Sequence, residues 1–274
     1  MGQVEAAGFP TLVRHFGEGP RAALMIHCTL GQSALWQPLA ERLGDLLSMT
    51  AFDLPGHGGS GAWQGPGDVQ ALAVRMAADL LGTGPADVIG HSFGGTVALR
   101  LAAERPELVR SLTLIEPVFF QVLAKDRPEL MAEHDLQMQP YADAVARGDW
   151  REAARLFTAV WGDGRPWDSL PDEQRSTMAR RMPVVEAASE AILADAGAVL
   201  ASGALERMAC PTLIVEGAES PRYIGAVCER LAARIPAARR AVIAGAGHMV
   251  PLTHPDAVAR ELRDFLGAGA APAA

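Results

Sequence analysis

The stretch Asp87-Val88-Ile89-Gly90-His91-Ser92-Phe93-Gly94-Gly95-Thr96-Val97-Ala98-Leu99 decides the fold of this chain. Its apolar start predicts a short β-strand, and the apolar spacing of its second half predicts a helix that ends before Pro106. Between the two, glycines flank Ser92, and we expect a side chain at Gly90 or Gly94 to clash in so tight a reversal. A serine at the apex of such a turn adopts a strained backbone conformation that lifts its hydroxyl clear of the sheet.

The pattern G-x-S-x-G also arises by chance in a chain with 28 glycines, so its context matters. A strand before the serine and a helix after it are the context that a nucleophilic serine requires. Backbone N–H groups at the start of that helix point toward the place where an anion would develop. The stretch therefore predicts a reactive serine.

Length and composition indicate one large domain, or one domain with an insertion, because the chain has 274 residues. Hydrophobic residues make up 49% and charged residues 20%, which predicts a sizeable core. The formal net charge is −8, and the arginines are scattered, so we expect no nucleic-acid partner.

The three cysteines, Cys28, Cys210 and Cys228, have neither paired nor metal-site spacing, which is typical of a reducing compartment. No basic segment followed by an apolar run is visible at Met1 to Pro10, and no apolar stretch approaches membrane-spanning length. We therefore expect a cytoplasmic protein without a membrane partner.

Strand and helix patterns alternate along most of the chain. The continuous apolar runs Ala22 to Ile26 and Met49 to Leu54 are typical of parallel strands that are covered on both faces. The alternation predicts an α/β fold with a mostly parallel, doubly wound sheet. The other expected strands and the last helix are Thr11 to Phe16, Ala86 to Ile89, Leu112 to Ile115, Thr212 to Val215, Ala241 to Ala244 and the helix Pro255 to Leu266.

The alternation stops after Glu116. Residues 117–208 read as several short helices, which we expect the prolines at positions 128, 140, 166, 171 and 183 to break. The prediction is thus a core formed by residues 1–116 and 209–267, a helical insertion over residues 117–208, and a disordered tail over residues 268–274.

A serine hydroxyl is a poor nucleophile at neutral pH and needs a general base, usually histidine. His248 lies in a glycine-rich loop after the last expected strand, at the same carboxyl edge of the sheet as Ser92. We expect His57 to belong to a turn and His91 to point into packing. His248 is therefore the candidate base.

The chain resembles the α/β-hydrolase family along nearly its whole length. The resemblance rests on Gly90-His91-Ser92-Phe93-Gly94-Gly95, Asp53-Leu54-Pro55-Gly56-His57-Gly58-Gly59-Ser60 and Gly245-Ala246-Gly247-His248, in the family's order and at its usual spacing. It implies the α/β-hydrolase fold, with residues 117–208 as a helical cap. It also implies Ser92 as nucleophile and His248 as base, while Asp53 matches a position that is usually structural.

The turn that supplies the family's oxyanion hole departs from the usual His-Gly-x-x-Gly, because it reads His27-Cys28-Thr29-Leu30-Gly31. The donors that the resemblance implies are the backbone N–H groups of Thr29 and Phe93, with assistance from the Thr29 hydroxyl. Thr29 as a plain loop residue is the alternative. We expect Cys28 to be a small packing residue, since no base is evident for it.

The acid that completes the site is the second departure. The family usually carries an aspartate in a Gly-x-x-Asp turn, and here that turn is Gly217-Ala218-Glu219-Ser220. A serine cannot hold a negative charge beside an imidazolium. Glu116 is our prediction for the acid because it ends the strand that follows the serine's helix. Glu219 is the alternative acid, and a site with neither remains open.

These residues predict a serine hydrolase that cleaves a carboxylic ester, or a related acyl compound, through an acyl-serine intermediate. The alternatives are thioester, lactone, carbon–carbon bond or peracid chemistry, and a non-catalytic relative that binds a ligand. We expect a small-molecule substrate that is apolar and uncharged, since no basic cluster is evident. No metal cluster or organic-cofactor motif stands out, and the oligomeric state is open.

Overall fold

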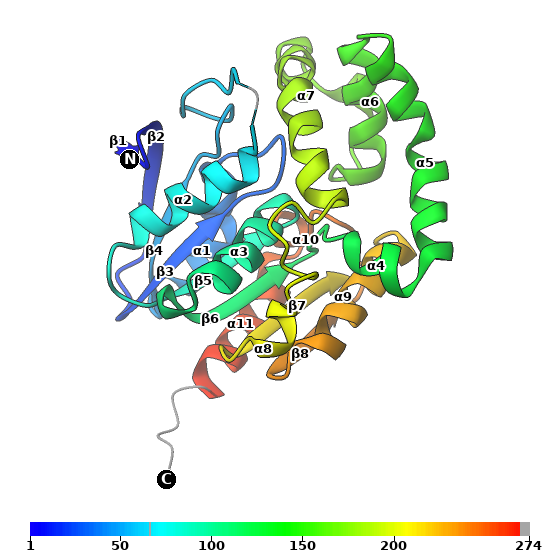
Figure 1. The fold of residues 1–274 in the computed structure, drawn as a ribbon. Helices are drawn as coiled ribbons and strands as arrows, with labels where there is room; N and C mark the ends of the chain where they lie inside the picture. Colours follow the sequence, from blue (N-terminus) through cyan, green and yellow to red (C-terminus); the bar gives the residue numbers. More distant parts are fainter. Residues whose placement is uncertain (66, 269–274) are drawn as a thin grey trace.

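An eight-stranded sheet runs through the computed structural model, which describes residues 1–65 and 67–268 (Figure 1). The strand order is β1-β2-β4-β3-β5-β6-β7-β8. β2 pairs antiparallel with β1 and β4, and the other neighbours pair in parallel. The strands are β1 (Gly2–Ala6), β2 (Phe9–Phe16), β3 (Arg21–Ile26), β4 (Leu47–Phe52), β5 (Ala86–His91), β6 (Val109–Ile115), β7 (Thr212–Gly217) and β8 (Ala238–Ile243).

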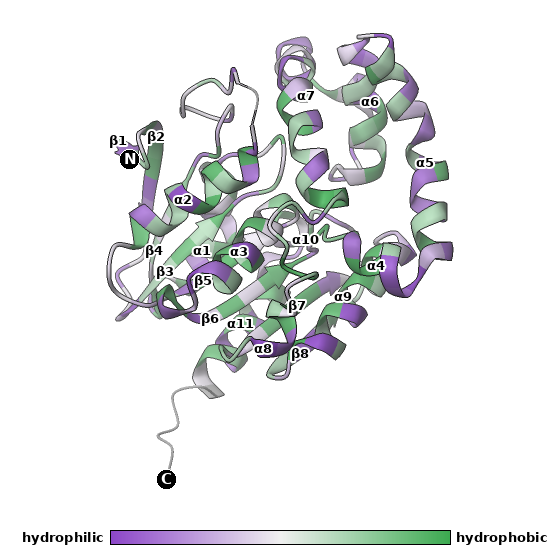
Figure 2. Cartoon of the chain, viewed as in Figure 1, coloured by the Kyte–Doolittle hydropathy of each residue, from purple (hydrophilic) through white to green (hydrophobic). Residues whose placement is uncertain are grey.

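Helices cover both faces of the sheet, and Figure 2 shows the apolar residues concentrated in the strands between them. Alternate residues of β3 divide between two cores: Leu24 belongs to one, and Met25 to the other. The first core packs against α2 (Val69–Leu81), α3 (Phe93–Glu104) and α9 (Arg222–Arg234), and the second against α1 (Gln37–Leu43) and α11 (Pro255–Ala268). The predicted α/β class with a mostly parallel, doubly wound sheet is confirmed.

Some predicted boundaries were wrong. The strand β1 was not predicted, because most of its residues are exposed and few are apolar. β8 begins at Ala238, whereas we predicted Ala241. The prediction began too late because Arg239 and Arg240 interrupt the apolar run. The last helix continues to Ala268, the first residue of the predicted tail. The rest of that tail, residues 269–274, lies outside the described residues.

Five α-helices and one 3-10 helix, η3 (Trp167–Ser169), lie between β6 and β7, within the segment for which the sequence predicted a helical insertion. Two are longer than predicted, because Pro140 and Pro183 lie inside α5 and α7 instead of breaking them. The carbonyl groups that lose their helical partners belong to Leu136, which is exposed, and Ala179, which is half-buried, so neither is sealed in the core. The helices are α4 (Gln121–Asp126), α5 (Pro128–Ala146), α6 (Trp150–Trp161), α7 (Asp172–Leu193) and α8 (Ala204–Arg207).

The inserted helices have a small core of their own between α5, α6 and α7. Ala144, Ala153, Ala154, Met182 and Val185 form this cluster, separate from the two sheet cores. Small alanines at the contacts allow the three helices to pack closely. In Figure 1 these helices stand to one side of the sheet, away from the C-terminus.

A buried network joins the loops after β3 and β4. Both oxygens of Asp53 accept backbone hydrogen bonds, from Ser33 N at 2.6 Å and Gly59 N at 2.8 Å. His27 Nε2 accepts from Leu54 N at 2.9 Å, and His57 Nε2 accepts from Leu30 N at 3.1 Å. Each ring donates its Nδ1 hydrogen to a backbone carbonyl, so both histidines are neutral. The network therefore fixes the loop that carries Thr29.

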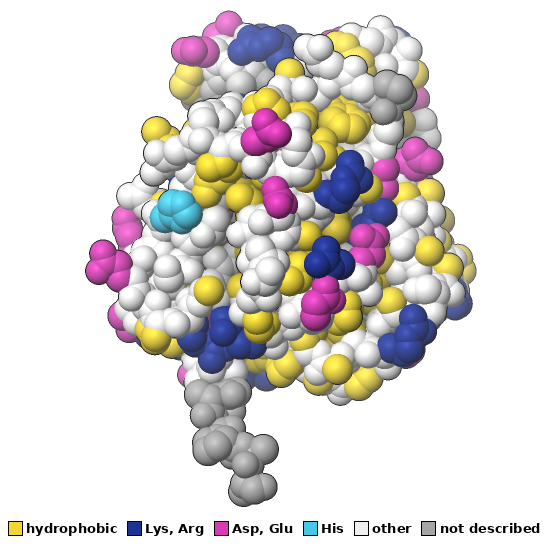
Figure 3. All heavy atoms as spheres, turned by 60° about the vertical axis from the view of Figure 1, so that its left-hand side comes forward, with side chains coloured by type: hydrophobic (Ala, Val, Ile, Leu, Met, Phe, Trp, Pro, Cys, Tyr) yellow, Lys and Arg dark blue, Asp and Glu magenta, His cyan; other side chains and the backbone are white. Residues whose placement is uncertain are grey.

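The surface carries charges of both signs. On the face shown in Figure 3, basic and acidic side chains lie among apolar ones. Several arginines pair with acids, among them Arg263 with Asp45 and Arg239 with Glu261. No helix in the described ranges is both long enough and apolar enough to cross a membrane.

Acidification should destabilise the fold through these histidines. Burial lowers the pKa of His57 to about 3 and of His27 to about 4. Below about pH 6.5 these histidines bind protons in the unfolded chain but not in the folded chain. Their contribution to the free energy of unfolding is therefore fully present above that pH and is lost progressively toward pH 3 to 4. Each histidine contributes up to about 1.4 kcal/mol per pH unit within this window.

Urea unfolding at a series of pH values tests this expectation. His57→Gln should be less stable at pH 7 and should show a shallower fall in the free energy of unfolding between pH 6.5 and 4. His15, which is exposed, is the control, and His15→Gln should unfold at the same urea concentration as the wild type at pH 7. An unchanged slope in His57→Gln would contradict the account.

Candidate active site

Ser92 occupies the turn between β5 and α3, as the sequence predicted. Its backbone has φ 57° and ψ −119°, a conformation that residues with a side chain rarely adopt. A Cβ atom at Gly90 would collide with the Gly94 carbonyl, and one at Gly94 would collide with the Ile26 carbonyl. The expected clashes are therefore confirmed, and they explain why glycine stands on both sides of the serine.

His248 lies in the loop after β8 and joins Ser92 to Glu116. Its Nε2 atom is 2.9 Å from Ser92 Oγ, and its Nδ1 atom is 2.9 Å from Glu116 Oε2. The carboxylate accepts the hydrogen on Nδ1, which leaves the Nε2 lone pair free to accept the serine hydroxyl hydrogen. All three side chains are buried, with 5% of His248 and none of Glu116 exposed.

Glu116 follows β6 directly and has φ 50°, in the left-handed region. That conformation costs roughly 1–2 kcal/mol for a residue other than glycine. The carboxylate accepts three hydrogen bonds, from His248 Nδ1, from Gly217 N at 2.6 Å and from Ser220 Oγ at 2.8 Å. A buried carboxylate requires such partners, so the strained backbone is held by the contacts that its side chain makes.

Ser220 and Glu219 lie in the turn after β7, where the resemblance implies an aspartate. Ser220 does not replace the acid but donates its hydroxyl hydrogen to it. The Glu219 side chain is exposed, and its backbone N–H donates to Ala246 O at 2.8 Å. The structure therefore brings Glu116, and not Glu219, into contact with His248.

Thr29 and Phe93, the two residues whose backbone N–H groups were predicted to form the oxyanion hole, come from different segments at the carboxyl edge of the sheet. Thr29 follows Cys28 in the loop after β3, and Phe93 is the first residue of α3. In the part of the chain that the structure describes, neither backbone N–H group donates a hydrogen bond to another protein group. Both groups are thus available to a ligand oxygen near Ser92, which is what the predicted oxyanion hole requires.

Cys28 is buried, and burial raises the pKa of its thiol to about 12. The thiol is therefore neutral at physiological pH and unsuited to nucleophilic attack. Asp53 holds the backbone of its own turn, as described above. Both residues have the packing and structural surroundings that the sequence led us to expect.

Two residues that support His248 were missed from the sequence. His91 Nε2 donates to the backbone carbonyl of His248 at 2.8 Å, whereas we expected its ring only to pack. Trp161, on α6, meets the His248 ring edge to face, with ring centroids 4.8 Å apart. Nothing in the linear sequence links α6 to the histidine loop, because 87 positions separate the two residues.

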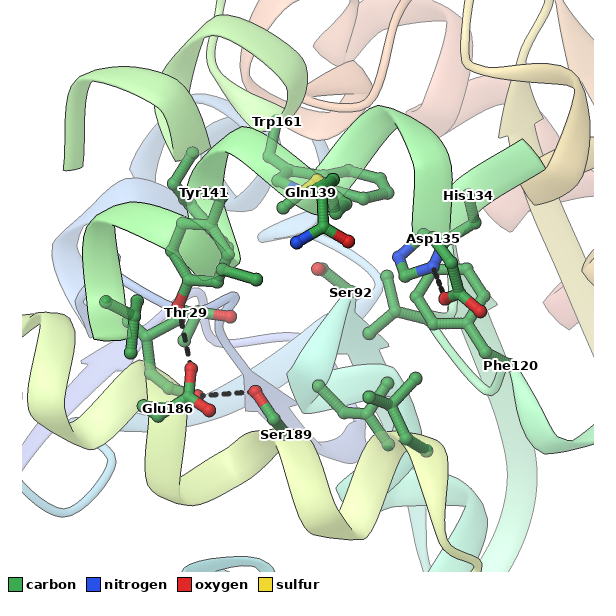
Figure 4. A pocket seen from close by; sticks show the side chains of 18 of the residues that line it. Thr29, Ser92, Phe120, His134, Asp135, Gln139, Tyr141, Trp161, Glu186 and Ser189 are labelled. Atoms are coloured by element: carbon green, nitrogen blue, oxygen red, sulfur yellow. Dashed lines mark hydrogen bonds and ion pairs between the residues drawn. The ribbon is translucent and has the colours of Figure 1, made fainter. Parts of the chain in front are cut away.

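A cavity of about 450 Å³, which we call the serine cavity, opens above Ser92 (Figure 4). In Figure 4 the Ser92 hydroxyl lies in the middle of the cavity, between α5 and α7. Tyr141 donates to Glu186 at 3.1 Å across the gap between these helices. Most of the lining is apolar, including Phe120, Phe157 and Trp161. The cavity is suited to an apolar group next to the serine.

Two groups of curated relatives match most of the chain. Lipase LipV of Mycobacterium tuberculosis is 31% identical over 263 residues, which cover 93% of this chain and 97% of the lipase. A pimeloyl-[acyl-carrier protein] methyl ester esterase of Neisseria meningitidis serogroup C is 32% identical over 248 residues, which cover 88% of this chain and 92% of the esterase.

Solved structures share the fold. An alpha/beta hydrolase from Sphaerobacter thermophilus superimposes with a TM-score of 0.71 at 24% identity, over 97% of this chain and 100% of that one. The family model described as "Alpha/beta hydrolase family" matches residues 23–261, which include the serine turn, the inserted helices and the histidine loop. The chain belongs to the alpha/beta hydrolase family.

Proposed function

We propose that this protein is a hydrolase that cleaves carboxylic esters through an acyl-serine intermediate, with Ser92 as nucleophile, His248 as general base and Glu116 as acid. The observation that carries the proposal is the chain of two 2.9 Å contacts from Ser92 Oγ through His248 to Glu116, at the floor of an apolar cavity. The relatives named as a lipase and as a methyl ester esterase support ester chemistry.

In the first half-reaction, Ser92 Oγ attacks the ester carbonyl carbon as its proton passes to His248 Nε2. Negative charge moves to the carbonyl oxygen, where the N–H groups of Thr29 and Phe93 stabilise it. His248 is then positively charged, and the Glu116 carboxylate stabilises the imidazolium through Nδ1. The proton passes to the alcohol as the ester C–O bond breaks, and the acyl group stays on Ser92.

In the second half-reaction, a water molecule takes the place of the alcohol. His248 removes a proton from this water, which attacks the acyl carbon, and the oxyanion forms again at the same donors. Collapse of that intermediate returns the proton from His248 to Ser92 Oγ and releases the acid. No step requires a group beyond these side chains, the two backbone donors and water.

The inserted helices form the substrate cap in this proposal, over a core of residues 1–116 and 209–267. The cap's own core and its share of the serine cavity support this division. Because the cavity that contains Ser92 is largely apolar, the acyl group is apolar and uncharged. The buried, unpaired Cys28 and Cys228 fit the reducing compartment that we expected, the cytoplasm.

A fluorophosphonate probe should label Ser92, because only a serine activated by a neighbouring base reacts with it. Intact-mass spectrometry should find one adduct on the wild type and none on Ser92→Ala, with both proteins folded. Ser189 also lines the cavity, but its hydroxyl donates to Val185 O, whereas His248 contacts Ser92. Ser189→Ala is therefore the control and should be labelled like the wild type.

Equal labelling of Ser92→Ala and the wild type would show that another residue reacts. A folded wild type that takes no label, and cleaves no activated short-chain ester, would favour the alternative of a non-catalytic relative that binds a ligand.

Glu116→Gln should reduce kcat on an activated ester by a factor on the order of 10⁴, the loss seen when a serine protease loses its triad aspartate. Glutamine keeps the shape of the side chain but removes the charge that stabilises the imidazolium. Glu219→Gln is the matched control and should change kcat less than about twofold, since its side chain is exposed.

Circular dichroism checks that both variants are folded. A large loss in Glu219→Gln with a small one in Glu116→Gln would reverse the assignment. Small losses in both variants would mean that Ser92 and His248 act as a dyad.

A further inference from the structure

A second cavity of about 570 Å³ adjoins the serine cavity, and we call it the arginine cavity. Thr29, Phe157 and Trp161 line both cavities, so the two meet beside the oxyanion turn. Met249, the neighbour of His248, lines the arginine cavity, whereas Ser92 lines the serine cavity. In the proposed mechanism the alcohol takes its proton from His248 while the acyl group stays on Ser92, which favours the arginine cavity for the alcohol portion.

Arg181 is the distinctive charge of the arginine cavity. It lies on α7 and is only partly accessible, and burial lowers the pKa of its guanidinium, against the opposing effect of Asp53. Within residues 1–65 and 67–268, no carboxylate oxygen lies within ion-pair distance of it. Its contact with the Leu30 carbonyl is long, at 3.4 Å. Partial burial of a guanidinium that has no carboxylate partner and only one long hydrogen bond costs free energy, and an anionic ligand would offset that cost.

The nearby acids are already engaged or exposed. Asp53 accepts hydrogen bonds from two backbone N–H groups, and Asp163 binds Arg165 at 2.8 Å. Glu173, the other acid of the cavity lining, is exposed. The guanidinium therefore remains available to an anion that enters the cavity.

The serine cavity has the opposite character. Its charged lining residues are Asp135 and Glu186, and it includes no arginine or lysine. His134, which also lines it, has its pKa lowered by burial and is neutral at physiological pH. An anion would be repelled by the two carboxylates of the serine cavity, whereas in the arginine cavity it would meet the guanidinium of Arg181.

We propose that Arg181 binds an anionic group, such as a carboxylate, on the alcohol portion of the ester. This inference rests on the proposed ester hydrolysis and narrows its substrate class: the acyl portion is apolar and uncharged, and the alcohol portion carries the negative charge. It revises the sequence expectation of an uncharged substrate, which rested on the absence of a basic cluster. A basic cluster is not needed to bind such a group, because one guanidinium can bind a carboxylate through two parallel hydrogen bonds.

Three esters test the orientation: 4-(butanoyloxy)benzoate, its neutral N,N-dimethylamide, and the phenyl monoester of adipic acid, whose charge is on the acyl portion. The wild type should have a higher kcat/KM for the benzoate than for the amide and should cleave the adipate poorly. Arg181→Gln should lower kcat/KM for the benzoate by about 10- to 100-fold, the range for a hydrogen bond to a charged group, and change that for the amide less than about twofold.

Two further variants distinguish binding of the anionic group by Arg181 from a structural role of this residue in the Leu30 loop. Arg181→Lys keeps the charge and should retain part of the preference. Arg180→Gln is the control, because Arg180 is exposed on the same helix, bonds to Thr177 and does not line either cavity. Equal losses for both butanoyl esters in Arg181→Gln would overturn the proposal, since they would assign Arg181 to holding the Leu30 loop. A wild type that does not distinguish the esters would also overturn it.

Failure to cleave any of the esters would contradict the proposed function instead. Equilibrium dialysis of 4-hydroxybenzoate then tests the anion site without catalysis. Binding to the wild type that weakens about tenfold or more in Arg181→Gln, and not in Arg180→Gln, supports the site, and equal binding to all three proteins overturns it.

Discussion

The hydrogen bond between Glu116 and His248 is the interaction on which the rest of the site depends. It joins the end of β6 to the loop after β8, and the same carboxylate binds Gly217 and Ser220 from the turn after β7. One buried carboxylate thus holds three neighbouring segments at the carboxyl edge of the sheet. Its burial is tolerable because each neighbour supplies a donor.

Two residues with a strained backbone lie at the same edge. Ser92 and Glu116 both have positive φ, and each follows directly on a central parallel strand. The strands are buried on both faces and paired on both sides, so they provide a rigid base for these two conformations. Strain that would be lost in a mobile loop is retained here, and it keeps the serine and the acid pointing toward His248.

The inserted helices complete the two cavities of the proposed site. Trp161 packs on His248 and, with Phe157, lines both cavities. α6 therefore lies where the two cavities meet, and in the proposed mechanism the acyl and alcohol portions of the ester part there. The two carboxylates of the serine cavity have no arginine or lysine beside them, whereas Arg165 and Arg181 offset the two acids of the arginine cavity, and this difference gives the proposed site a direction as well as a shape.

The elements that depend on local pattern could be predicted from the sequence. The serine turn, the central strands and His248 all lie within short stretches whose glycines and apolar runs have a direct steric meaning. Glu116 was also accessible to prediction, because Ser220 left the usual acid position without a charge. Trp161 and Arg181 were not, since their roles depend on how α6 and α7 pack over the sheet. Pro140 and Pro183 misled the prediction because an exposed proline can be accommodated inside a long helix.

Proton NMR of the His248 ring tests the central claim most directly. A hydrogen on Nδ1 that is shared with a buried carboxylate gives a resonance far downfield of the amide region, and protection from water keeps it observable. We expect this resonance in the wild type and in Glu219→Gln, and its loss in Glu116→Gln. Its persistence in folded Glu116→Gln, or its loss in Glu219→Gln, would contradict the assignment of Glu116 as the partner of His248.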